Sequence, residues 1–100
     1  HPGRHVKMAL KHLGMSNAQA ARILDVAPVH VGDLIKGRRD LSIAMCYKLA
    51  GLLGSTPEHW MALQDQYDMK VAEKNQKLAK LKTAVSRRFK DYQQENSAHV

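Results

Sequence analysis

The sequence predicts an all-α protein, and three observations carry that prediction. Ala, Leu, Lys, Met and Gln, which are good helix formers, dominate the 100 residues. Aromatic residues make up only 5% and β-branched residues are sparse, whereas strands are rich in both. Apolar residues recur at helical spacing between Gly, Pro, Ser and Thr residues that begin or end helices. With 44% hydrophobic residues, the chain can form one small core.

Two short helices are expected first. One follows Pro2, which suits a first helical turn, and ends at the C-cap glycine Gly14. The next begins at Ser16, and Gln19 stands where a capping box requires it. This helix stops near Asp25, a residue type that tolerates positive φ.

Three more helices are expected before residue 69. The first of them runs over residues 27–35. Ser42 caps the next helix, and Gly54 closes it. The cap of the last one is either Ser55 or Thr56.

The helices over residues 16–24 and 27–35 have the spacing of a helix-turn-helix. Ala21 is small enough for the point where they cross, and Asp25 suits the turn between them. Apolar residues hold the second helix at a steep angle: Leu24, Val26, Val31 and Leu34. The combination favours a motif that binds double-stranded DNA. A purely structural helical hairpin is the alternative.

The composition changes at residue 69, so we expect a helix-turn-helix domain over 1–68 and a basic C-terminal helical extension with a frayed tail over 69–100. Residues 70–90 carry eight Lys and Arg residues and one Glu, together with a narrow apolar stripe. Three interpretations of this basic helix stay open: a dimer helix, extra phosphate contacts, or a helix on a membrane surface.

Four blocks of sequence carry a family resemblance: residues 1–3, 21–26, 34–42 and 53–60, the last continued by similarities up to residue 68. On these blocks, residues 1–75 resemble the HigA-type antitoxins, a branch of the Cro/C1 (Xre) helix-turn-helix family. The resemblance implies a five-helix, lambda-repressor-like DNA-binding domain that dimerises on a palindromic operator and represses its own operon. Many members also neutralise a toxin of the HigB type, an mRNA-cleaving ribonuclease.

The chain departs from the family pattern in three places. Arg4 stands where the family usually has Glu, and Ala27-Pro28 opens the third helix in place of Ser or Thr. Asn17 stands where the wider family often has a phosphate-bonding Gln. The resemblance therefore implies a DNA contact for Asn17 through a side chain that is one methylene shorter.

The outward face of the third helix is expected to meet DNA through Pro28, Val29, His30 and Asp33. This face has no Arg, Lys, Gln or Asn to read a base edge by the usual bidentate pairings. We therefore expect modest base readout, assisted by DNA shape and half-site spacing. Affinity is expected from phosphate contacts by basic residues: Arg22, Lys36, Arg38 and Arg39, with Lys11 as a further candidate.

A homodimer is also expected, because one short helix-turn-helix makes too few contacts to hold a specific site. Apolar residues beyond Pro57 supply the expected interface: Trp60, Leu63, Tyr67, Val71, Leu78, Leu81 and Val85. Lys74 interrupts this stripe, so the seam is expected to be limited. The alternative is that Trp60 and Leu63 complete a monomer core.

Other kinds of site are not indicated. Cys46 is the only cysteine, so no internal disulfide forms, and an unpaired cysteine suits the cytoplasm. His1, His5 and His12 have helical spacing but no Cys, Asp or Glu nearby to complete a metal site. No catalytic arrangement, cofactor site or membrane span is apparent. We expect neither an enzyme nor a membrane-bound protein.

The sequence leaves three functions open. The first is a sequence-specific repressor that is the antitoxin of a type II toxin–antitoxin module, favoured by the net charge of +7 and the basic loop over 36–39. The second is an interaction module that mainly masks a HigB-type toxin, favoured by the weak recognition face. Many RNA-cleaving toxins are themselves basic, which makes that match electrostatically awkward. The third is a mobile-element regulator without a toxin.

Overall fold

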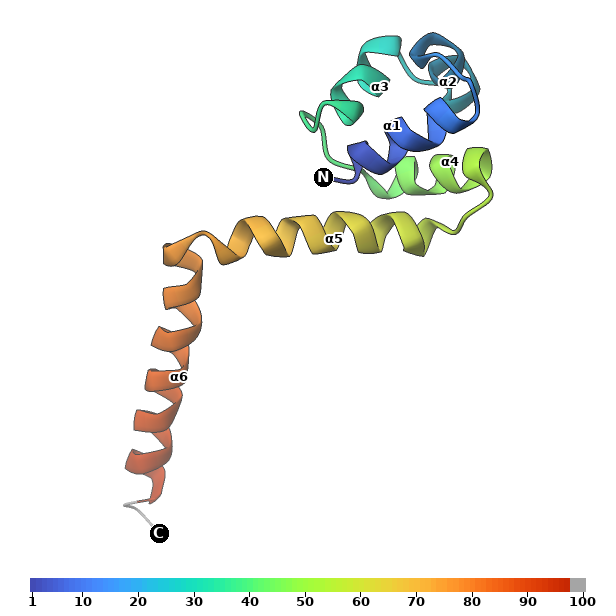
Figure 1. Cartoon of the computed structure of the whole chain (residues 1–100). Helices are drawn as coiled ribbons and strands as arrows, with labels where there is room; N and C mark the ends of the chain where they lie inside the picture. Colours follow the sequence, from blue (N-terminus) through green and yellow to red (C-terminus); the bar gives the residue numbers. More distant parts are fainter. Residues whose placement is uncertain (98–100) are drawn as a thin grey trace. The chain divides into compact units, whose positions relative to one another are not determined.

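The computed structural model describes residues 1–97, and all of the regular secondary structure in that range is α-helical, as the composition predicts. The chain divides into two compact units, one over residues 1–68 and one that begins at Met69. The helices, drawn in Figure 1, are α1 (Gly3–His12), α2 (Asn17–Leu24), α3 (Pro28–Ile35), α4 (Ile43–Leu53), α5 (Pro57–Glu73) and α6 (Gln76–Ser97).

Local side-chain chemistry sets the helix ends. The Ser16 hydroxyl accepts from the Gln19 N–H at 3.1 Å, and the Gln19 side chain accepts from the Ser16 N–H at 2.9 Å, which confirms the capping box. Gly54 ends α4 in the left-handed conformation, with φ 69°. Of the two candidate caps of α5, Thr56 accepts from the His59 N–H. Ser55 instead accepts from the indole N–H of Trp60 at 2.7 Å.

One hydrophobic core holds the N-terminal unit together. Helix α3 packs on α1 and α2, and α4 packs on α2, so that the first four helices surround a common centre (Figure 1). Helix α5 closes this core through Trp60, and the Gln64 side chain accepts a buried hydrogen bond from the Leu41 N–H at 2.8 Å. The buried apolar side chains are Val6, Leu10, Ala20, Ala21, Leu24, Val31, Leu34, Leu41, Met45, Cys46, Leu49 and Trp60.

The start of α1 lies against the end of α3. Gly3 is buried, and a Cβ added to it would overlap the backbone carbonyl oxygen of Leu34. The His1 ring accepts from the Gly3 N–H at Nδ1, so its proton sits on Nε2, which donates to Asp40 at 3.0 Å. The same ring meets the Tyr67 ring edge-on, with 4.7 Å between centroids. His1 therefore ties α1, the loop before α4 and α5 together.

The C-terminal unit differs from the single basic helix expected from Lys70 onward. Helix α5 ends at Glu73, and Asn75 accepts from the Lys77 N–H at 3.0 Å to start α6. The Asx-type cap competes with helix continuation, which explains the break. Every residue of α6 up to Asn96 is exposed, including its apolar stripe.

Candidate nucleic-acid interface

The turn between α2 and α3 is set by Asp25, which adopts the left-handed conformation with φ 55°. It is the only non-glycine residue with positive φ among residues 1–97. The Val26 N–H then donates to the Ala21 carbonyl at 3.0 Å, and the backbone turns into α3. Lys48 of α4 donates to the Asp25 carbonyl at 3.4 Å. The predicted helix-turn-helix geometry is confirmed.

Helix α3 has one buried face and one open face. Val31 and Leu34 are fully buried against the core. The opposite face carries Val29, Gly32 and Asp33, with Lys36 directly after the helix, because residues at i, i+3, i+4 and i+7 share one side of a helix. Val29 is the first residue on this face and is 67% exposed. We call these four residues the open face of α3. Pro28, at the start of the helix, is also exposed.

His30 lies at the flank of α3 and is less exposed than Val29. Burial, and next the positive charges of Arg39 and Lys48, hold the pKa of His30 below its usual 6.5, while Asp33 opposes them. The sequence analysis placed His30 on the outward face; the structure shows it half-buried, with Lys48 of α4 close enough to affect its pKa. Lys48 was missed because no sequence signal links α4 to this flank.

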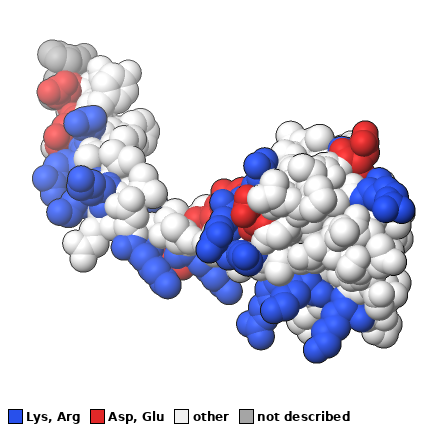
Figure 2. Space-filling view, turned by 90° about the horizontal axis from the view of Figure 1, so that it is seen from above, with Lys and Arg blue, Asp and Glu red and all other residues white. Residues whose placement is uncertain are grey.

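The loop after α3 presents three basic residues. Gly37 has φ 74°, and the Arg38 N–H donates to the Asp33 carbonyl at 2.8 Å, so the chain folds back over the helix end. Lys36, Arg38 and Arg39 are all exposed. Figure 2 shows that Lys and Arg form separate patches on the visible face of the N-terminal unit.

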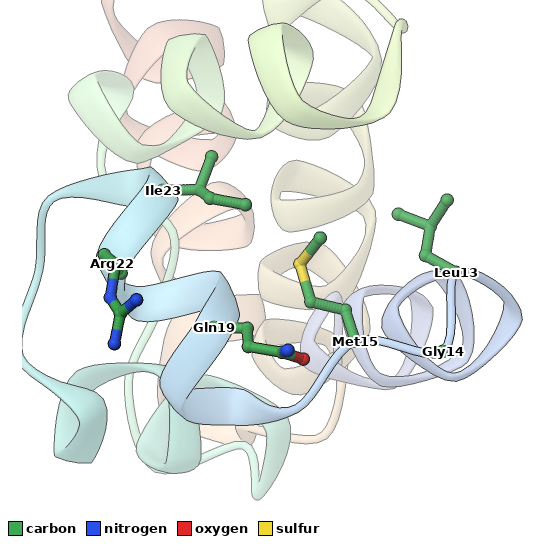
Figure 3. Close-up of a pocket in the computed structure, with 6 residues that line it drawn as sticks. All are labelled: Leu13, Gly14, Met15, Gln19, Arg22 and Ile23. Atoms are coloured by element: carbon green, nitrogen blue, oxygen red, sulfur yellow. The ribbon is translucent and has the colours of Figure 1, made fainter.

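The two α2 residues predicted to bind DNA lie apart from each other. Asn17 is exposed at the first turn of α2. Arg22 is exposed on the side of α2 opposite its buried alanines. It lines an open depression of about 330 Å³ together with Gln19, Ile23 and the segment that follows α1, Leu13 to Met15 (Figure 3). The structure therefore groups Arg22 with a partly apolar surface that the sequence analysis did not identify.

The residues predicted for a dimer interface fall into three groups. Trp60 is only 4% exposed within one chain, so it belongs to the core, and little of its surface is left for a partner. Leu63 and Tyr67 are half-buried in the N-terminal unit. The others are exposed, by 45% to 61%: Val71, Leu78, Leu81 and Val85.

Two further features are absent from residues 1–97. No group of three or more His, Cys, Asp or Glu side chains is placed to hold a metal ion. None of the helices is both long and apolar enough to cross a membrane.

Comparison with known families decides the class of this fold. The family described as Helix-turn-helix matches residues 6–60, which run from α1 into α5. The chain belongs to the Cro/C1 (Xre) helix-turn-helix family. This family consists of regulators and antitoxins and not of enzymes, in agreement with the sequence analysis.

Two related sequences extend the match. The chain is 40% identical over 70 residues to virulence-associated protein A' of Dichelobacter nodosus, covering 69% of this chain and 61% of that protein. It is also 31% identical to an uncharacterised HTH-type transcriptional regulator of Escherichia coli, YddM, covering 85% of this chain and 90% of that protein.

Solved structures place the resemblance in one branch of the family. An addiction module antidote protein of the HigA family from Coxiella burnetii matches with a TM-score of 0.71 and 33% identity, over 87% of this chain and 90% of that one. The antitoxin HigA of Pseudomonas aeruginosa, solved with the higBA promoter, matches with a TM-score of 0.70 and 30% identity, over 72% and 79%. The predicted resemblance to HigA-type antitoxins is confirmed.

Proposed function

We propose that the protein is a sequence-specific repressor that binds double-stranded DNA with α3 in the major groove. The observation that carries this proposal is the open face of α3, which ends with the exposed Lys36 and is followed by two more exposed basic residues, Arg38 and Arg39. A helix about 10–12 Å wide fits a major groove of about 12 Å. The basic loop then reaches the phosphates at the groove edge. The P. aeruginosa antitoxin solved with its promoter supports the proposal.

Within this proposal, the contacts divide into two kinds. Pro28, Val29 and Asp33 meet base edges, and His30 lies at the flank of the groove. Phosphate contacts come from Asn17 and the basic loop over 36–39. Arg22, which lies beside the depression, contributes only if the DNA backbone passes along α2.

Selection of binding sites from a pool of random DNA duplexes tests this function. The expected product is a palindrome with half-sites about 34 Å apart, as for paired helix-turn-helix units. The variant Val29→Ala should select a changed motif at one position of each half-site. Selection of no motif by the wild-type chain would contradict the function. An identical motif for the variant would contradict α3 as the reading helix.

We further propose that the protein acts as a homodimer in the cytoplasm, where its DNA is. The interface uses the exposed apolar residues of α6, with Leu63, Tyr67 and Val71 of α5 contributing. Each chain contacts only one half-site of the operator, so two chains must pair to form a tight, specific complex with DNA.

A second candidate function is that of an antitoxin that masks a HigB-type ribonuclease toxin and represses the operon that encodes both. The observation in its favour is the depression lined by exposed Leu13 and Ile23, a surface that lies outside α3 and its basic loop. Co-expression with the product of the neighbouring gene tests it. Rescue of growth and co-purification support this role. If the neighbouring gene product stays toxic and forms no complex with this chain, the antitoxin function is contradicted and the protein is a repressor without a toxin partner.

A further inference from the structure

The middle of α3 holds a glycine that the fold does not need. Gly32 stands five residues into an eight-residue helix, where glycine is less favourable than alanine because it orders a more flexible backbone. Its φ is not positive, so no backbone conformation requires glycine there. A Cβ built on Gly32 would meet no heavy atom within 4 Å, so packing does not require it either. The reason for this glycine therefore lies outside the chain.

The position of Gly32 indicates what that reason is. It follows Val29 by three residues, so the two share one side of the helix, and Asp33, which comes directly after Gly32, belongs to the same open face through its four-residue spacing to Val29. These side chains are short, so they reach base edges only if the helix backbone comes close. A carboxylate on Asp33, for example, accepts from a cytosine amino group only at hydrogen-bond distance.

We propose that Gly32 is a specificity-determining residue whose missing side chain lets α3 sit deep in the major groove. This inference rests on the proposed DNA-binding function and adds a mechanism to it. The short side chains of Val29 and Asp33 then read the bases by close contact, methyl group against methyl group at Val29. A side chain at position 32 would hold the helix away from the bases and weaken these contacts together. Contacts of the basic loop to phosphates would change much less, since long flexible side chains adapt.

Alanine substitution separates this role from a structural one. Gly32→Ala should raise the Tm of the full chain by about 4 °C, because alanine favours the helix. The same variant should bind the site selected by the wild-type protein at least tenfold more weakly. Gly32→Leu, with a longer side chain that also favours the helix over glycine, should lose more. Binding to unrelated DNA should change less than threefold in both variants.

Gly51 supplies the matched control. It lies inside α4, is exposed, and also has no heavy atom within 4 Å of a built Cβ. Gly51→Ala should raise the Tm similarly and leave the affinity for the selected site unchanged.

Three outcomes would overturn the inference. The first is a Gly32→Ala variant that binds the selected site as tightly as the wild type. The second is a fall in its Tm, which would show that the fold needs this glycine. The third is an equal loss of affinity in Gly51→Ala. In each case the wild-type protein still binds its site, so the proposed function stands. Failure of the wild type to select any site would overturn both.

Discussion

Two adjacent arginines follow α3, and their position predicts one kind of DNA contact. Arg38 and Arg39 are exposed, and the Arg38 N–H is bonded to the Asp33 carbonyl, which fixes the start of the loop against the helix. A loop held in this way places its side chains at the edge of the groove. Phosphates are identical in every sequence, so contacts to them carry no base preference.

Replacing both arginines should therefore weaken all DNA binding about equally. In Arg38→Ala combined with Arg39→Ala, the slope of log affinity against log salt concentration should fall by about two units, one for each lost phosphate contact. Titration of selected and unrelated DNA at several salt concentrations measures this. Unchanged affinity, with Lys7→Ala as the surface control, would show that these arginines do not face DNA.

His30 predicts how binding depends on pH. In the free protein its pKa is held below 6.5 by burial and then by Arg39 and Lys48. Nearby phosphates would raise that pKa in the complex, so the complex takes up a proton. Affinity should then rise as the pH falls from about 7.5 towards 5.5, the range around the unperturbed histidine pKa.

The variant His30→Gln should show a flatter profile than the wild type. Fluorescence anisotropy on one labelled duplex across this pH range measures the difference. A profile that is identical in both proteins would place His30 outside the range of the phosphates.

At the scale of elements, local signals were the most predictable. The capping box of α2, the left-handed Asp25 and the Gly54 cap depend on residues a few positions apart, so the sequence alone indicates them. Contacts between distant residues were not predictable. His1 bonds Asp40 across 39 positions, and no periodic pattern records such a pair.

The candidate site was predictable in part for the same reason. The recognition helix and its basic loop follow from spacing, and the membership of Gly32 in the open face could have been found from its spacing to Val29 and Asp33. The significance of Gly32 could not have been predicted from the sequence, because it depends on the empty space around this residue in the folded chain. The placement of Arg22 beside the end of α1 depends on how two helices pack, which side-chain type does not reveal.

The contact between α1 and α3 predicts a costly substitution. A methyl group at Gly3 would overlap the Leu34 carbonyl, and backbone cannot move aside as a side chain can. Gly3→Ala should therefore lower the free energy of unfolding by about 1–3 kcal/mol. Urea denaturation measures it, with Gly51→Ala as a substitution into open space. Equal stability of the two variants would mean that α1 shifts without cost.

At the scale of the whole molecule, the charge is unevenly distributed. Residues 1–68 carry eight Lys and Arg against six Asp and Glu, and residues 69–100 carry eight against three. Lys77, Lys82 and Arg88 lie within one turn of the apolar stripe on α6, so two paired copies of this helix would bring like charges together. Salt screens such exposed charges over a Debye length of about 8 Å at physiological ionic strength.

The proposed dimer should therefore strengthen with salt, while DNA binding weakens. Sedimentation at micromolar concentration should show a larger dimer fraction at high salt. The double variant Leu81→Ser and Val85→Ser should be monomeric, whereas Met8→Ser, which changes an equally exposed residue of α1, should pair normally. A wild-type chain that remains monomeric at every salt concentration would contradict the dimer.

Chemical labelling of the buried Cys46 thiol can measure how often the N-terminal unit opens. Cys46 is the only cysteine, it is 1% exposed, and burial, followed by the charge of Asp65, raises its pKa. Thiol reagents attack the thiolate, so labelling requires the core to open transiently. Its rate then measures how often each molecule opens. Saturating selected duplex, at about 100 times its Kd, should slow labelling about 100-fold if opening destroys the DNA-binding face. A labelling rate that is the same with and without DNA would mean that the unit opens around Cys46 while α3 stays in place.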